Sequence, residues 1–269
     1  MKRNDMITAA RALLNDAGAA VWSAALLSSL IDRAVDFYSL YLPAEDTEDI
    51  ATVSGSREIS LAAMQLAYPI RRILAVEFPI GSTPRQFNDF TVFGSVLTME
   101  AVTGDGDDAR IYYQRYRELH SIWVANTAYA LGDIVVPTGT PNGYCYICTT
   151  AGTSHATTEP TWPTTIGDTV NDGTAVWTCR KYPYIIADHY PLLCSGIAGY
   201  AYEEYGRRLI NSLTDGGSQT AVRYAKQGYY ALQQFKSELA TYSRHDEIRV
   251  TQLYRPQSPR ISRFRDPGP

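Results

Sequence analysis

The sequence pattern with the clearest chemical meaning is a Cys-x-x-Cys pair, Cys145 and Cys148, followed by His155. Such a pair binds zinc when a tight turn separates the thiols and a second ligand pair completes the site, and it does redox chemistry when it opens a helix. Here Tyr and Ile separate the cysteines, and the neighbouring residues are typical of a β-strand. Because side chains on a strand alternate between faces, the two thiols should point in opposite directions. We expect two buried structural cysteines, with a zinc site as the alternative.

No other group of residues forms a recognisable catalytic site. The four histidines are far apart and belong to no nucleophile or metal motif. The aspartates of residues 103–109 hint at a calcium loop, but the run is too short for an EF-hand and lacks the closing glutamate, so a hairpin turn is expected. A polysaccharide hydrolase would need a supported pair of carboxylates, and none is evident. We therefore expect a protein that is not an enzyme and that uses no metal or other cofactor.

Composition limits the classes of partner. The 269 residues carry a formal net charge of −4, so no global attraction to nucleic acid is expected. No stretch is long and apolar enough to span a membrane, and the first residues do not resemble a signal peptide, so we expect reduced thiols and no membrane partner. Tyrosine is over-used, with 20 residues against 7 phenylalanines, which suits either a surface buried against a partner or a large, wet core.

Residues 122–179 differ in composition from the chain on both sides. They contain fourteen threonines, three of the four tryptophans, no lysine, no arginine and a net charge of −4, whereas the rest of the chain is neutral. A break this sharp at both ends predicts an inserted domain. Short β-branched and aromatic runs at 133–137 and 144–150, with turn signals at 141–143 and 171–174, predict that the insert is all β.

Three stretches of the insert carry a resemblance: WVANTAYALGDIVVP, NGYCYICTTAGTS and EPTWPTTIGDTVNDGTAVWT. They are similar to small β modules of the chitin-binding carbohydrate-binding type, and modules with a similar sequence recur in structural proteins of tailed bacteriophages. The resemblance places Trp123, Tyr129, Tyr146 and Trp177 at the aromatic positions of the module. These side chains would form either an exposed glycan platform or the core, and the small size of the segment favours the core.

The flanking sequence predicts a helical layer and a β-rich middle. Apolar residues at helical spacing predict helices over residues 5–16, 22–43, about 191–213 and 218–242. Ser23 is a candidate N-cap for the second helix, and Trp22 before it can pack on Leu27. Alternating runs predict strands at 57–63, 71–80, 85–94, 95–102 and 109–119. The buried face of the last helix is expected to contain Ala221, Val222, Ala225, Tyr229, Leu232, Phe235 and Leu239.

Together these elements predict an α+β fold in three parts. Residues 1–121 and 180–250 form a discontinuous domain with about four helices and the β-rich middle, residues 122–179 form the inserted all-β domain, and residues 251–269 form an extended, basic, Pro-rich C-terminal arm. The arm would be disordered alone. It is a solubilising tail or, as its spacing of charged and large apolar residues favours, it docks on an acidic partner. The docking residues are Tyr254, Arg255, Arg260, Ile261, Arg263, Phe264 and Arg265.

The residues around the β-rich middle carry a second resemblance. They are WSAALLSSLIDRAVDFYSLYLP in front, TVSGSREISLAA where the strands begin, and YPLLCSGIAGYAYEEYGRRLI with AVRYAKQGYYALQQFKSEL behind. With the order of elements, these stretches resemble the head-to-tail connector (adaptor, or neck) proteins of tailed bacteriophages. The resemblance covers most of residues 1–120 and 181–250.

This resemblance implies a structural role in a virion. Connector proteins of this kind form a ring, typically a dodecamer, beneath the portal protein, and the C-terminal arm often reaches into the portal. The ring continues the channel for genomic DNA without sequence recognition and docks the next neck or tail protein. We therefore expect a homo-oligomeric ring at the head–tail junction of a virion, made in the bacterial cytoplasm, with the insert pointing outward. The alternative is a glycan-binding surface protein that displays the inserted β module.

Overall fold

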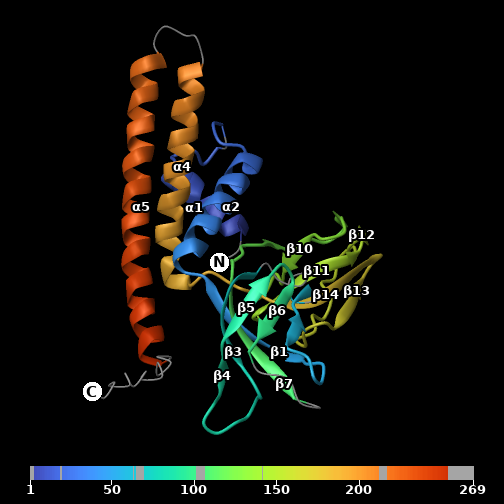
Figure 1. The fold of residues 1–269 in the computed structure, drawn as a ribbon. Helices are drawn as coiled ribbons and strands as arrows, with labels where there is room; N and C mark the ends of the chain where they lie inside the picture. The colour runs from blue at the N-terminus through green and yellow to red at the C-terminus, as the bar shows by residue number, and fades with distance from the viewer. Residues whose placement is uncertain are drawn as a thin grey trace, which may run out of the picture.

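The computed structural model describes residues 3–18, 20–62, 64, 70–100, 107–140, 142–211 and 217–253. Within these residues the chain has four α-helices and several small sheets, which confirms the expected α+β fold class. Figure 1 shows a helical layer beside the β region, and the layer contains α1 (Arg3–Leu13), α2 (Ala24–Tyr41), α4 (Tyr190–Asn211) and α5 (Gly217–Leu253). None of the helices in the described ranges is both long enough and apolar enough to cross a membrane.

Helix α2 contributes one face to the helical core. Its N-cap is Ser23, as the sequence predicts, because the serine side chain accepts a hydrogen bond from the backbone N–H of Leu26. Trp22 is buried, and its ring centroid lies 5.2 Å from that of Tyr205 on α4. The apolar stripe that the sequence predicts for α2 is buried in the helical core at Leu27, Leu30, Ile31, Ala34 and Tyr38.

Helices α4 and α5 form a long hairpin in which the two backbones approach closely (Figure 1). A Cβ atom added at Gly228 would lie 2.7 Å from the backbone nitrogen of Glu203 and 2.9 Å from the carbonyl oxygen of Gly199. Glycine is needed at this crossing because any side chain would displace backbone atoms. The close approach limits the width of the α5 face that α4 can cover.

The buried face of α5 is therefore narrower than the sequence predicts. Leu232, Phe235 and Leu239 are buried as expected, but Val222 is 46% exposed and Tyr229 is 58% exposed. The prediction for these two residues is wrong, because both lie outside the part of α5 that packs on α4. They leave an apolar strip along the open side of the helix.

Helix α5 also extends further than the sequence predicts, to Leu253. Residues 251–253 therefore belong to the helix and not to the extended arm. The first proline after the helical pattern is Pro256, so no proline interrupts the helix before that point.

The β-rich middle forms two antiparallel sheets, with strand orders β1-β7-β3-β4 and β2-β6-β5. Their buried residues form one cluster, with Ile59, Val76, Leu97 and Ile111 among its members. Each predicted strand run overlaps an observed strand. The strands are β1 (Ala44–Ala51), β2 (Glu58–Ser60), β3 (Ile70–Glu77), β4 (Phe87–Asn88), β5 (Phe90–Phe93), β6 (Val96–Met99) and β7 (Asp108–Arg115).

The sequence pattern does not predict β1, because half of its residues, AEDTEDIA, are acidic and acidic residues are depleted in strands. Its charges are matched across the sheet by β7. Asp49 pairs in register with Arg110, and its carboxylate accepts two hydrogen bonds from that guanidinium at 2.6 and 2.8 Å. Asp46, which is in register with Tyr113, forms an ion pair with the buried Arg115 farther along β7. A local sequence pattern cannot predict ion pairs between residues this far apart in the chain.

The Thr-rich segment forms a sheet of its own with the order β13-β14-β11-β10-β8, and a separate pair, β12-β9. The strands predicted at 133–137 and 144–150 and the hairpin turn at 171–174 are confirmed. The strands are β8 (Ser121–Ile122), β9 (Ala128–Tyr129), β10 (Ile134–Val136), β11 (Tyr144–Thr150), β12 (Gly152–Thr153), β13 (Thr169–Asp172) and β14 (Ala175–Lys181).

The chain enters and leaves this sheet at one place. The backbone N–H of Glu118 donates to the carbonyl of Pro183 at 3.1 Å, and the backbone N–H of His120 donates to the hydroxyl of Tyr182 at 3.2 Å. An inserted segment requires this adjacency, since the host fold can then continue across a short gap. The division of the chain into domains remains a prediction.

Candidate functional site

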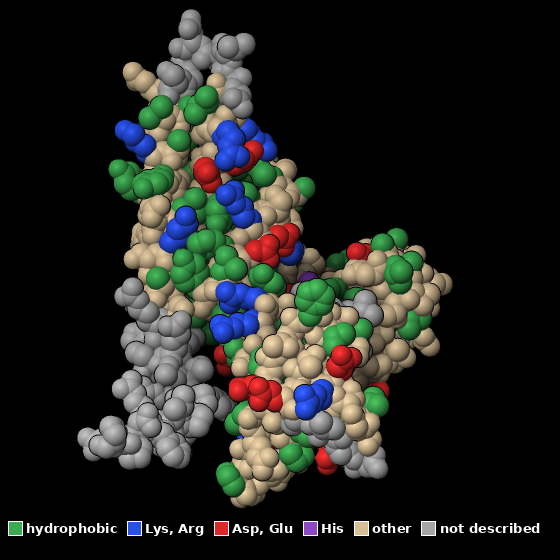
Figure 2. Space-filling view, viewed as in Figure 1, with side chains coloured by type: hydrophobic (Ala, Val, Ile, Leu, Met, Phe, Trp, Pro, Cys, Tyr) green, Lys and Arg blue, Asp and Glu red, His purple; other side chains and the backbone are tan. Residues whose placement is uncertain are grey.

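A groove of about 840 Å³ runs along the helical layer between α2, α4 and α5. Figure 2 shows apolar side chains gathered on this face of the helices, flanked by basic and acidic ones. The residues that line the groove are Arg33, Asp36, Phe37, Leu40, Tyr116, Tyr200, Glu203, Ala225, Tyr229, Leu232, Gln233 and Lys236.

Aromatic side chains hold the walls of the groove in place. The ring centroid of Phe37 lies 5.9 Å from that of Phe235, which belongs to the helical core. On the other wall, the guanidinium of Arg33 lies 4.2 Å from the ring centroid of Tyr200 and 3.7 Å from a carboxylate oxygen of Glu203. Because each wall is anchored to the core or to a neighbouring side chain, the groove exists before any partner binds.

The charges around the groove are balanced. Arg33 and Lys236 are basic, and Asp36 and Glu203 are acidic. Burial, together with the nearby charge of Asp32, raises the pKa of the Asp36 carboxyl above its ordinary value. A nucleic-acid site would need an excess of basic side chains. Serine, cysteine and histidine are not among the described residues that line the groove, and its ionisable side chains are the carboxylates, the tyrosines and the two basic groups.

Apolar surface in the groove continues from the helical core. Leu40 is 46% exposed and Tyr229 is 58% exposed, while Leu232 beside them is buried. Val222, which lies two helical turns before Tyr229, extends the exposed strip along α5. These exposed apolar side chains lie beside the buried helical core.

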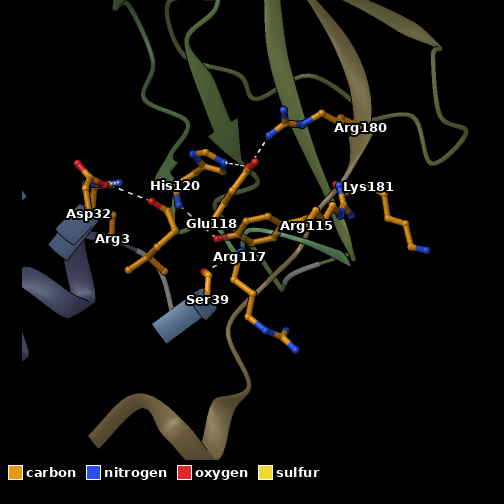
Figure 3. Close-up of polar contacts among 11 residues, drawn as sticks. Arg3, Asp32, Ser39, Arg115, Arg117, Glu118, His120, Arg180 and Lys181 are labelled. Carbon is orange, nitrogen blue, oxygen red and sulfur yellow. Dashed lines mark hydrogen bonds and ion pairs between the residues drawn. The ribbon is translucent and has the colours of Figure 1, made fainter. Parts of the chain in front are cut away.

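A second cluster of polar side chains joins the Thr-rich sheet to the rest of the fold (Figure 3). Glu118 accepts a hydrogen bond from Nε2 of His120 at 2.5 Å and forms an ion pair with Arg180 of β14. A carboxylate oxygen of Asp46 lies 3.1 Å from Arg115, and the same carboxylate pairs with Lys181. We call this cluster the polar junction, and its members are Asp46, Arg115, Glu118, His120, Arg180 and Lys181.

Glu118 is the carboxylate of the polar junction that contacts both His120 and Arg180. Burial disfavours its charged form, but the hydrogen bond from His120 and the positive charge of Arg180 outweigh burial and hold the pKa of the carboxyl below its ordinary value. Glu118 is therefore ionised at neutral pH, and its charge holds Arg180 at the base of the inserted sheet.

Two further arginines fix the chain around the polar junction (Figure 3). Arg3 pairs with Asp32 and donates from Nε to the carbonyl of Leu119 at 2.9 Å. Arg117 donates to the backbone carbonyls of Leu42 and Tyr184 at 2.7 and 2.6 Å. The sequence analysis missed both arginines, because backbone carbonyls are acceptors that no sequence motif reveals.

Three metal-ligand atoms lie close together at the polar junction. The ligand atoms of Glu118, His120 and Cys145 are within 4.8 Å of one another, and this donor set would suit zinc. However, Arg180 forms an ion pair with Glu118, and His120 also hydrogen-bonds to that carboxylate. A cation already occupies the carboxylate ligand, so we interpret the cluster as an ion-paired element of the core.

The Cys-x-x-Cys pair is divided between the two faces of β11, as the strand pattern predicts. Cys145 lies in a cluster with Val136 and Tyr182, whereas Cys148 lies with Trp177 in the core of the Thr-rich sheet. The two thiols therefore cannot bind one ion. Burial raises the pKa of all four cysteine thiols, that of Cys145 to about 11, so none is an activated nucleophile at neutral pH.

The aromatic positions of the module-like segment lie in its core. Trp123 is 6% exposed, and Tyr146 and Trp177 are fully buried. Tyr129 is half-buried, with its ring centroid 4.9 Å from that of Trp177. The carboxylate of Asp172 accepts hydrogen bonds from the indole N–H groups of Trp123 and Trp177 at 2.6 and 3.0 Å. A ring that stacks on a sugar must present an open face, so these residues form a core and not an exposed glycan platform.

The residues expected to dock on a portal protein follow α5 and lie outside the part of the chain that the structure describes. Their role stays a prediction: Tyr254, Arg255, Arg260, Ile261, Arg263, Phe264 and Arg265. Residues 101–106, which include part of the aspartate-containing run, also lie outside it.

Comparison with known proteins assigns no family. The chain matches no protein-family model, and none of the curated proteins matches it. Function is therefore inferred from the groove, from the exposed apolar strip beside it and from the polar junction.

Proposed function

We propose that this protein is a structural subunit of a tailed bacteriophage that forms a ring, dodecameric as in the connectors it resembles, between the portal and the tail. The observation that carries the proposal is the groove between α2, α4 and α5, where Leu40 and Tyr229 expose apolar surface beside the core. A monomer seldom leaves such surface open. In a closed ring each subunit covers its neighbour, so the surface is buried in every copy.

The distribution of charge supports a role around a DNA channel. The net charge is −4, and the groove has as many acidic as basic side chains. Contacts to phosphate dominate protein–DNA affinity, so a subunit without a dense basic surface lets DNA pass without holding it. The ring would continue the channel of the portal and present its other side to the next neck or tail protein.

The inserted sheet would project from the ring. It joins the host fold where Glu118 and Pro183 meet, and the polar junction fixes its base. An insertion at a single crossing leaves the helical layer free to contact neighbouring subunits. The glycan-binding alternative is less well supported, because the four aromatic residues that the resemblance assigns to the module pack in the core of this segment.

The test is co-assembly with the portal protein from the same source, followed by electron microscopy and native mass spectrometry. We expect a ring on the tail-facing end of the portal. A chain truncated after Leu253 should keep its fold and lose portal binding, because the basic arm is absent. Unchanged portal binding by the truncated chain would refute the role of the arm. A full-length chain that stays monomeric with and without the portal would contradict the ring itself.

A further inference from the structure

The chain carries an apolar projection on its β-rich middle. Strands β5 and β6 form a hairpin in which Phe93 pairs with Val96 across the turn at Gly94, which has φ +60°. Phe93 is 92% exposed, and Val92 and Val96 beside it are 44% and 36% exposed. Positive φ at the turn and the tight strand pairing give this hairpin a defined shape.

The tip of this hairpin carries no charge. From Phe90 to Met99 the sequence contains no acidic or basic residue. A single exposed apolar residue on a protein surface needs no explanation. Here three exposed apolar side chains share one turn, and the largest is an aromatic residue of the type that anchors protein interfaces.

The groove and the hairpin both expose apolar side chains, and neither carries a net charge. The groove offers exposed apolar side chains at Leu40 and Tyr229, and its acidic and basic groups are equal in number. An uncharged apolar hairpin entering the groove would leave no introduced charge buried without a partner, which a strongly acidic or basic segment could not avoid. The two surfaces also belong to different elements, so one chain presents both halves of a head-to-tail contact.

We propose that the β5–β6 hairpin of one subunit inserts into the groove of the next copy, with Phe93 packed between Leu40 and Tyr229. This inference rests on the proposed ring and identifies its subunit interface. Because hairpin and groove are distinct surfaces, the contact repeats in one direction around the ring and closes only when the last hairpin meets the first groove.

Three variants of the full chain test this interface. Phe93→Asp places a charge on the hairpin, Tyr229→Asp places one in the groove, and Tyr230→Asp is the matched control, since Tyr230 is 68% exposed on the same helix and does not line the groove. Self-association is measured by sedimentation velocity and native mass spectrometry over a range of concentrations, and circular dichroism verifies the fold. The first two variants should raise the dissociation constant at least about tenfold, and the control should not.

A mixture of the hairpin and groove variants provides the sharpest result. Each Phe93→Asp chain keeps an intact groove and each Tyr229→Asp chain keeps an intact hairpin, so the mixture should form heterodimers and no closed ring. If both variants form rings as readily as the wild type, or if the mixture gives no dimer while the wild type forms rings, this interface is wrong and the proposed ring stands. A wild-type chain that remains monomeric at all concentrations, both with and without the portal protein, would instead contradict the proposed ring, and this interface with it.

Discussion

Replacing Asp46 by asparagine should destabilise the protein far more than replacing Asp49, although both aspartates lie on β1. The Asp46 side chain is 5% exposed, and its carboxylate lies 3.1 Å from the guanidinium of Arg115, which is 2% exposed. Asparagine keeps the shape of the side chain and removes its charge. The Arg115 guanidinium then stays buried beside the positive charge of Lys181 without the carboxylate that balances both.

The size of the effect follows from burial. Removing one partner of a buried ion pair costs about 3–5 kcal/mol, a large part of the roughly 5–15 kcal/mol that stabilises a typical protein. At about 2–4 °C per kcal/mol for chains of comparable size, Tm should fall by about 6–20 °C. The Asp49–Arg110 pair has side chains 49% and 30% exposed, and a surface pair of this kind contributes only about 0–1 kcal/mol.

The assay is thermal and urea unfolding followed by circular dichroism for Asp46→Asn, Asp49→Asn, Arg115→Met and the double variant Asp46→Asn/Arg115→Met. Removing both members of the buried pair should recover much of the stability that either single substitution loses, because no isolated charge remains. The reasoning is refuted if Asp46→Asn is no more destabilising than Asp49→Asn, or if the effects of the two single substitutions simply add.

Three further predictions concern packing and ionisation. Gly228→Ala should lower the free energy of unfolding by about 1–3 kcal/mol despite the better helix propensity of alanine, because the added Cβ would meet the backbone of α4. Gln227→Ala is the exposed control, and a Gly228→Ala variant more stable than this control would rule out the close packing. The pKa of the Glu118 carboxyl is lowered in the folded protein, so this group stabilises the fold above the unfolded pKa near 4.5, and that stability is lost as the pH falls through the folded pKa. The Glu118→Gln variant should therefore lose less free energy of unfolding on acidification than the wild type, and an equal dependence on pH in the two proteins would contradict this. The four buried thiols should react with an aromatic disulfide reagent only at the rate of unfolding, and rapid labelling of the native protein would disprove their burial.

Much of the fold could be predicted because local patterns determine it. The Ser23 cap, the apolar stripe of α2 and the alternating faces around Cys145 and Cys148 each depend on neighbouring residues, and all three are observed. The strands at 133–137 and 144–150 and the hairpin turn at 171–174 could be predicted equally well, since turn residues lie beside them in the sequence.

The candidate sites could not be predicted in the same way, because they depend on contacts between distant residues. Strand β1 is stabilised by charges on β7, and the polar junction unites residues from three separated stretches of chain. The groove is lined by residues of α2, α4 and α5 that are far apart in sequence, and Tyr229 lies in it because α4 does not cover that side of α5. A periodic pattern identifies apolar positions on a helix, but it cannot tell which of them a neighbouring helix covers and which remain exposed.

The central claim, that this protein is a ring subunit at the head–tail junction of a virion, is tested most directly by locating it on particles from the source of this sequence. The measurement is electron microscopy of those particles labelled with an antibody against residues 122–179, the segment expected to project outward. Label confined to the junction between head and tail is the predicted result. Label at the tail tips or on the cell surface, or the absence of any labelled particle, would contradict the account.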